Sequence, residues 1–147
     1  MPTTIDSAGI TFNDATSLTS ANIGTAQLVN GSVIASKLGT TEQKQIAKAW
    51  VNFNGTTSPG TIRAQYNVSS VTKNGTGDYT ITFTTPMSDA NYSTIISGNG
   101  TSTVNVTVGG TRTALTGSCR IDVGSVGSSP SGIPTDRDAV SVAIFGN

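Results

Sequence analysis

The chain has 147 residues, and four small or backbone-permissive types, 25 Thr, 18 Ser, 17 Gly and 11 Asn, make up just under half of them. Its 8 basic and 8 acidic residues cancel, His is absent, Cys occurs once, and the only Glu is Glu42. This composition disfavours most enzyme classes, because acid–base catalysis, imidazole ligation of metals and thiol chemistry need residue types that are scarce here. The chain also has no Lys/Arg cluster, which disfavours a surface that binds nucleic acid or an anionic membrane.

The remaining composition predicts a folded, strand-rich protein. Hydrophobic residues make up 35% of the chain, which argues against disorder, and a Thr/Val/Ile-rich, Glu/Lys-poor sequence favours strands over helices. No run approaches the ~18 apolar residues of a membrane-spanning helix, and the N-terminal MPTTIDSAG lacks the pattern of a signal peptide. We therefore expect no membrane insertion and no ordinary secretion. The lone Cys119 has no disulfide partner in the chain and is expected to be a small buried hydrophobic residue.

The first forty residues place an apolar residue at a strict interval of five. These residues are Leu18, Ile23, Leu28, Val33 and Leu38, within the units TSLTS, ANIGT, AQLVN, GSVIA and SKLGT. An interval of five matches neither helix nor strand periodicity, and so few units cannot bury a solenoid core within one chain. The pattern predicts that residues 1–40 form an attachment or stalk segment in which these five residues self-associate around a common axis.

The segment TTEQKQIAKAW, residues 40–50, is the helical candidate. Thr40 with Gln43 three residues later matches a weak capping box, and the residues between them and Trp50 are mostly good helix formers. One or two turns are expected. We interpret residues 41–48 as a short helical connector between the stalk and a head.

From Trp50 onward, short strands alternate with breaks rich in Gly, Asn, Ser and Pro. The strands are predicted at Ala49–Asn54, Thr61–Val68, Ser70–Lys73, Asp78–Thr85, Tyr92–Gly98, Thr103–Val108, Thr111–Leu115, Cys119–Val123 and Ala139–Phe145. The breaks fall at 54–60, 74–77, 99–101, 109–110 and 125–138, and Asn-Gly pairs among them supply the positive φ that tight hairpins need. This spacing predicts an all-β fold, with an antiparallel β-sandwich head over residues 49–147.

Two of these strands alternate cleanly enough to predict a buried face. The residues expected to face the core are Ile62, Ala64, Tyr66 and Val68 in one strand and Tyr79, Ile81 and Phe83 in the other. Trp50 and Phe53 lie three apart in one strand, so they are predicted to point to opposite faces. At least one of them is expected to meet solvent or another subunit.

The Asp residues are the remaining candidates for chemistry, because a Ser-His-Asp or Cys-His device needs His. A glycosidase pair would come from Asp78, Asp89, Asp122, Asp136 or Asp138. Asp78 and Asp89 fall in turns, where Asp ordinarily caps backbone amides, so catalysis is the weaker interpretation. Asp136 and Asp138 could ligate a divalent cation, but Arg137 between them favours a local ion pair or a solvated loop. We predict no catalytic residue, no metal site and no cofactor.

Three segments resemble a module of tailed-bacteriophage tail fibres and related virion appendages. They read VNGSVIASKLG (29–39), KAWVNFNG (48–55) and IRAQYNVSSVTKNGTGDYTITFTTPMSDANYS (62–93). The resemblance covers roughly residues 29–93, extends to residues 94–147 only in general character, and does not separate a tail fibre from a capsid spike. It implies a homotrimeric, non-enzymatic virion component that is assembled in the host cytoplasm and exposed on the particle.

Three functions are compatible with these features. The first is a homotrimeric tail-fibre or spike subunit that attaches the particle to its host by non-catalytic binding, with cell-surface glycan as candidate receptor and other virion proteins bound through the N-terminal segment. The second is a trimeric capsid decoration or head-fibre protein without a dedicated receptor, which the short stalk and the start at Met1 favour. The third, disfavoured by the missing His and single Glu, is a polysaccharide depolymerase. The receptor-contact residues stay open; we expect them in loops 125–138 and 99–102 and in the GGTR turn at 109–112.

Overall fold

The computed structural model describes residues 4–6, 9–11, 17–18, 34, 37–99, 106–126 and 133–146. The chain divides into two compact units, residues 1–39 and 40–147. In the first unit, an antiparallel sheet has the order β1–β2–β3; its strands are β1 (Thr4–Asp6), β2 (Gly9–Thr11) and β3 (Ser17–Leu18). Of the period-five residues, Ile23, Leu28 and Val33 lie outside the described residues, so their self-association stays a prediction.

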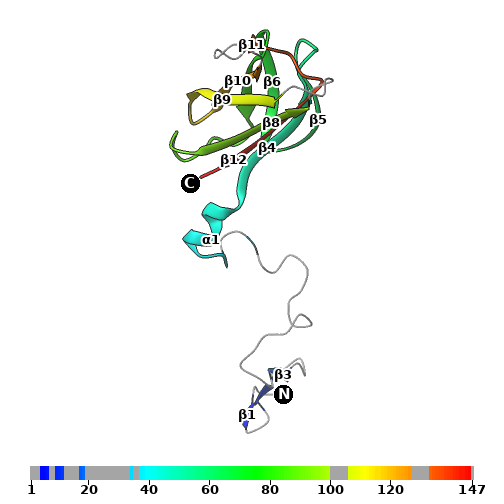
Figure 1. Ribbon diagram of the computed structural model, residues 1–147. Helices are drawn as coiled ribbons and strands as arrows, with labels where there is room; N and C mark the ends of the chain where they lie inside the picture. The colour runs from blue at the N-terminus through cyan, green and yellow to red at the C-terminus, as the bar shows by residue number, and fades with distance from the viewer. Residues whose placement is uncertain are drawn as a thin grey trace. The chain divides into compact units, whose positions relative to one another are not determined.

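The second unit begins with a short helix followed by a four-stranded sheet. Helix α1 (Thr40–Gln45) confirms the predicted helical turns, and the chain is extended again from Ala47. The sheet has the order β5–β4–β12–β8 with antiparallel neighbours throughout. Its strands are β4 (Ala47–Asn54), β5 (Thr61–Tyr66), β8 (Ser93–Asn99) and β12 (Ala139–Phe145) (Figure 1). No helix among the described residues has the length and apolar character needed to cross a membrane.

A five-stranded sheet completes the second unit. Its strands are β6 (Val68–Gly75), β7 (Asp78–Phe83), β9 (Val106–Ala114), β10 (Ser118–Val126) and β11 (Ile133–Pro134). One edge of β10 pairs with β9 along most of its length, and the other edge pairs first with β7 and then with β11. The outermost strand on the β7 side is β6. All of these pairs are antiparallel.

The inner faces of the two sheets form one hydrophobic core, which confirms the predicted all-β, sandwich-like fold. Its buried residues include Ala49, Val51, Phe53, Val71, Tyr79, Ile81, Phe83, Cys119, Ile121, Val123, Val140, Val142 and Ile144. The rings of Phe53 and Tyr79, one from each sheet, pack edge to face with centroids 5.0 Å apart, a favoured aromatic geometry. The alternation predicted in β7 is confirmed, and Trp50 and Phe53 point to opposite faces as expected.

The alternation predicted for residues 62–68 is wrong within β5. Ile62 packs against the core, but Ala64 is exposed and Tyr66 keeps 57% of its surface exposed. The register between β4 and β5 skips Arg63, and such an extra residue is a β-bulge. Because side chains alternate along a strand, the bulge turns Ala64 and Tyr66 to the outer face.

Asn67 passes the chain from one sheet to the other. Its φ is 56°, in the left-handed region that Asn tolerates better than most residues. Its side-chain amide donates to the carbonyl oxygens of Lys48 and Thr85, both at 3.1 Å, and its Oδ1 accepts from the Thr85 N–H at 2.7 Å. Val68, expected at the end of β5, is therefore buried as the first residue of β6.

The break predicted at Gly109–Gly110 is also wrong, because β9 runs through both glycines. Gly109 pairs with Val123, and Gly110 pairs with Asp122. A Cβ at Gly109 would collide with the Ile96 side chain on β8. Glycine here permits a close approach of strands from the two sheets; no turn is made.

Candidate functional site

A depression of about 580 Å³ opens on the five-stranded sheet where the β6–β7 hairpin, β9, β10 and β11 meet. Its charged lining comes from Asp78, Asp122 and Arg112, and much of the remaining surface is glycine backbone. The strand ladder places Asp78 beside Asp122 and Asp122 beside Gly110. Cross-strand partners share a face, so these residues lie together on the side opposite the buried Tyr79.

Two arginines neutralise this pair of carboxylates. Arg120 approaches Asp78 with both Nε and Nη2, at 2.9 and 2.5 Å. Arg112 bridges the two acids, with Nε 2.9 Å from Asp122 and Nη1 3.3 Å from Asp78. The register between β9 and β10 skips Arg112, so a second bulge presents this side chain. Asp78, Asp122, Arg112 and Arg120 are called the charge quartet below.

The quartet is a neutral but strongly polar patch. The hydrogen bond from Arg120 lowers the pKa of Asp78 to about 2; burial opposes this shift, and Asn74 and the charge of Arg112 add to it. Asp78 is thus ionised near neutral pH and cannot supply the proton that a glycosidase acid must donate. The side chains of Arg112 and Asp122 keep 49% and 45% of their surface exposed. Both therefore remain accessible for hydrogen bonding to a ligand.

Glycines keep the depression open. A Cβ at Gly110 would meet nothing within 4 Å, so this position leaves free space on the solvent side. A Cβ at Gly124 would come within 2.8 Å of the Ile133 carbonyl oxygen, and Gly77 at the hairpin has a φ of 65° with backbone close by. These two glycines let β11 lie against the hairpin and β10.

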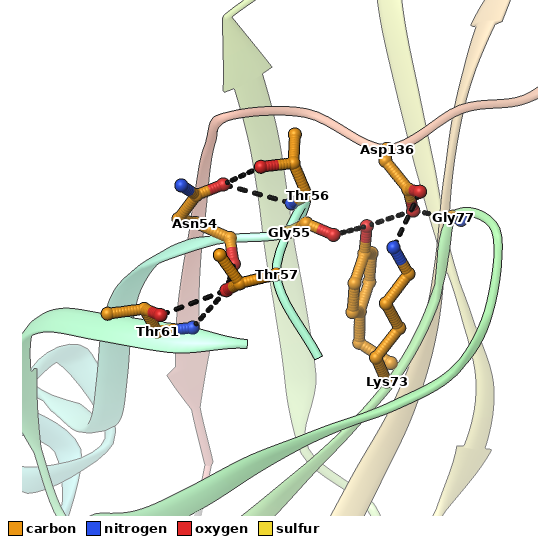
Figure 2. Close-up of polar contacts among 9 residues, drawn as sticks. Asn54, Gly55, Thr56, Thr57, Thr61, Lys73, Gly77 and Asp136 are labelled. Atoms are coloured by element: carbon orange, nitrogen blue, oxygen red, sulfur yellow. Dashed lines mark hydrogen bonds and ion pairs between the residues drawn. The ribbon is translucent and has the colours of Figure 1, made fainter. Parts of the chain in front are cut away.

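A second polar cluster holds the segment around Asp136 against the sheet (Figure 2). Asp136 accepts hydrogen bonds from Lys73 Nζ at 2.6 Å, from the Tyr79 hydroxyl at 2.7 Å and from the Gly77 N–H at 2.9 Å. The Tyr79 oxygen also lies 3.0 Å from the carbonyl oxygen of Gly55. Burial favours a raised pKa of Asp136, but these hydrogen bonds outweigh it and the pKa is lowered. Asp136 therefore has a structural role.

Hydrogen bonds of threonine and asparagine side chains hold the neighbouring loop 54–60, which Figure 2 also shows. Asn54 Oδ1 accepts from the Thr56 N–H at 2.9 Å and from its hydroxyl at 2.7 Å. The Thr57 hydroxyl donates to the Asn54 carbonyl at 3.1 Å and accepts from the Thr61 N–H at 2.9 Å. Local contacts of this kind stabilise turns.

A local ion pair or a solvated loop was expected around Arg137, and the ion pair with its acidic neighbours is absent from the described part of the chain. Asp136 instead pairs with Lys73, and Asp138 is exposed. Arg137 turns inward with 5% of its surface exposed, and its Nε and Nη2 have no hydrogen-bond partner. The carboxylate of Asp136 is instead taken up by Lys73, Gly77 and Tyr79.

The structure brings together only two of the five candidate acids, Asp78 and Asp122. Asp89 caps a backbone amide as predicted, since its Oδ1 accepts from the Asn91 N–H at 2.7 Å. The same role predicted for Asp78 is wrong, because arginine side chains occupy its carboxylate. Within the described ranges, no group of three or more Cys, Asp or Glu side chains is placed to hold a metal ion. Cys119 is fully buried, as predicted, and burial raises the pKa of its thiol.

The regions in which receptor contacts were expected overlap part of this lining, and receptor contact there stays a prediction. Gly109, Gly110 and Arg112 line the depression, and so does Pro134 from the expected loop 125–138. Residues 100–105 and 127–132 lie outside the described residues. The charge quartet was missed. The alternation of Cys119, Ile121 and Val123 places Arg120 and Asp122 outward, but only the pairing of β10 with β7 brings in Asp78.

A larger hollow of about 690 Å³ lies beside Tyr66, Asn67 and residues 84–88. Among its described lining residues, Lys48 is the only charged one, so this hollow offers fewer specific charged groups than the quartet depression.

Comparisons of the chain with protein-family models, with curated proteins and with solved structures gave no match.

Proposed function

We propose that this protein is a bacteriophage virion component, a homotrimeric tail-fibre or spike subunit that attaches the particle to the host surface by non-catalytic binding. The observation that supports binding is the quartet depression. It combines exposed, mutually neutralised charges with bare glycine backbone on a rigid sheet. Such a surface can exchange hydrogen bonds with a polyhydroxylated ligand such as a cell-surface glycan.

The proposed trimer provides the affinity that a shallow site lacks. A depression of this kind presents few contacts, so a single site is expected to bind weakly. Three heads on one fibre, and several fibres on one particle, convert successive contacts into intramolecular events and raise the overall avidity. The N-terminal segment with its period-five residues would join the copies and connect them to other virion proteins.

Adsorption competition tests the attachment function. Host cells preincubated with the full chain should adsorb fewer phage particles, because the soluble protein occupies the receptor. The variant Gly110→Val fills the depression from its open side and should lose this competition, whereas Thr82→Ala, farther along the same sheet, should retain it. Undiminished adsorption at saturating wild-type protein would contradict the attachment function.

Two further measurements separate the alternatives. Antibody against residues 49–147 should label the tail of intact particles, whereas labelling over the whole capsid together with unblocked adsorption would favour a decoration or head-fibre protein. Incubation with host surface polysaccharide should leave its chain length unchanged. Shortened chains would instead favour a depolymerase.

A further inference from the structure

The outer face of the four-stranded sheet presents an apolar row that crosses all four strands. Strand pairing places Tyr66 beside Trp50, Trp50 beside Ala143, and Ala143 beside Ile95. Tyr66, Trp50 and Ile95 keep 57%, 40% and 61% of their surface exposed. Single exposed apolar residues are ordinary, but a contiguous group of this kind marks an interaction surface.

A hollow interrupts the apolar row at its centre. Ala143 is small and stands between the larger Trp50 and Ile95, and a hollow of about 350 Å³ opens there. The next row supplies polar neighbours, Asn52 and Ser141, whose side chains hydrogen-bond to each other at 2.8 Å. An apolar centre with a polar, internally satisfied border has the anatomy of a protein–protein interface.

The absence of charge from the two central rows of this face favours a second copy of the same chain as its partner. The two basic residues of these strands, Lys48 on β4 and Arg63 on β5, fall at irregularities that the strand pairing skips, outside the two rows. The apolar row and the neighbouring row of Ala64, Asn52, Ser141 and Ser97 contain no ionisable group other than the Tyr66 hydroxyl. Two copies of these rows can meet without like-charge repulsion between them and without removing water from an unpaired ion within them. The charge quartet on the other sheet would not permit this as readily.

Chain connectivity favours the same partner. Trp50 lies five residues after Gln45, the last residue of α1, on the strand that follows the segment predicted to self-associate. Copies joined through their N-terminal segments would therefore bring their β4 strands into one neighbourhood. In a closed ring of three, one part of a surface meets a different part on the next copy. Tyr66 at the β5 edge and the hollow at Ala143 are two such parts.

We propose that the outer face of the four-stranded sheet docks against a second copy of this chain, with an apolar side chain of one row entering the hollow at Ala143 of the other. This inference rests on the homotrimer in the proposed function and assigns its head-to-head contact. It leaves the quartet depression on the opposite sheet free for a receptor.

Trp50 is the only tryptophan of the chain, so its fluorescence reports on this face alone. Light scattering on the full chain gives the number of copies, and acrylamide quenching of the same sample gives the accessibility of Trp50. We expect an oligomer in which Trp50 is protected. Ile95→Lys places a charge in the row and should increase quenching several-fold while circular dichroism stays unchanged. Leu115→Lys, a similarly exposed position in the β9–β10 turn, is the matched control and should leave quenching as in the wild type.

The other outcomes overturn the proposal in distinguishable ways. An oligomer with freely quenched Trp50 would leave the trimer intact but show that the heads dock elsewhere or not at all. A monomer with protected Trp50 would mean that the chain covers the row itself. A monomer with accessible Trp50 would remove the trimer and this contact together. The proposal would also be overturned if Ile95→Lys left the protection of Trp50 from quenching unchanged, because a lysine within the row should disrupt a contact made there.

Discussion

The outer faces of the two sheets differ in charge although their inner faces are built alike. On the five-stranded sheet, Asp78, Asp122, Arg112 and Arg120 stand together and pair with one another. On the four-stranded sheet, an apolar row of Tyr66, Trp50, Ala143 and Ile95 occupies the corresponding outward positions. Between the sheets, both contribute aliphatic and aromatic residues to one core.

This difference shows where the fold places constraints and where it leaves freedom. Burial fixes the inward positions of every strand, because apolar area removed from water is the main favourable term in folding. The outward positions are released from that requirement and can be occupied according to what each face meets. The charged, glycine-lined depression suits the polar ligand proposed for it, and the uncharged apolar row suits the proposed contact with a copy of the chain.

The largest expected effect tests the inner side of the comparison. Ile81 is fully buried, and its neighbour Thr82 points outward. Ile81→Ala should lower the free energy of unfolding by about 3 kcal/mol, through lost burial and an unfilled cavity. Thr82→Ala should change it by less than about 0.5 kcal/mol. Urea unfolding at one protein concentration measures both, and similar losses in the two variants would mean that the outer face of β7 is also covered.

The two adjacent glycines of β9 offer the next test, at the place where the sheets approach. Gly109→Ala forces a methyl group into Ile96 and should cost about 2 kcal/mol, as overpacking generally does. Gly110→Ala projects into open space and should be neutral or stabilise by about 0.5 kcal/mol, because alanine reduces the freedom of the unfolded chain. Thermal unfolding of the two variants gives the comparison. Equal destabilisation would show that Gly110 also faces a packed surface.

The sequence was informative wherever a local rule determined the structure. Strict alternation in residues 79–83 identified the buried face of β7, and odd spacing separated Trp50 from Phe53. The capping role of Asp89 followed from turn chemistry. In each case the deciding interaction lies within one strand or one turn.

Prediction failed where strand pairing overrode the local pattern. The bulge at Arg63 reverses which side chains of β5 face the core. Gly109 and Gly110 continue β9, and the lack of a side chain at Gly109 lets Ile96 on β8 pack closely against it. The charge quartet depends on β7, β9 and β10 lying side by side, and Asp136 finds Lys73 rather than the adjacent Arg137. These contacts join residues distant in sequence, and a single sequence does not reveal strand order.

A smaller effect concerns the pKa of Asp78 within the quartet. The hydrogen bond from Arg120 lowers this pKa from 3.8 to about 2, so the folded protein binds the proton less readily than the unfolded chain. The stabilisation is complete above pH ~4 and is lost as the pH falls toward 2. It should amount to about 1 kcal/mol, allowing for the exposure of both arginines.

The variant Asp78→Asn isolates this contribution. The pKa of Asp136 is also lowered, and its acid sensitivity is common to both proteins, so it cancels from the difference between them. Urea unfolding near pH 5 and pH 2.5 should show the wild type losing more stability than the variant. An equal loss would mean that Asp78 is not held as an ion by its arginines.

The smallest expected effect is the coupling between Arg112 and Asp122. Their side chains are nearly half exposed and 2.9 Å apart, and exposed ion pairs contribute little because water and salt screen them. A double-mutant cycle with Arg112→Gln and Asp122→Asn should give a coupling of about 0.5 kcal/mol or less in the free energy of unfolding, decreasing further with salt. Charges that matter so little to folding remain available to a ligand. A coupling of about 2 kcal/mol would instead make this pair a structural element, like Lys73 and Asp136, and would argue against the proposal that its charges are available to a ligand.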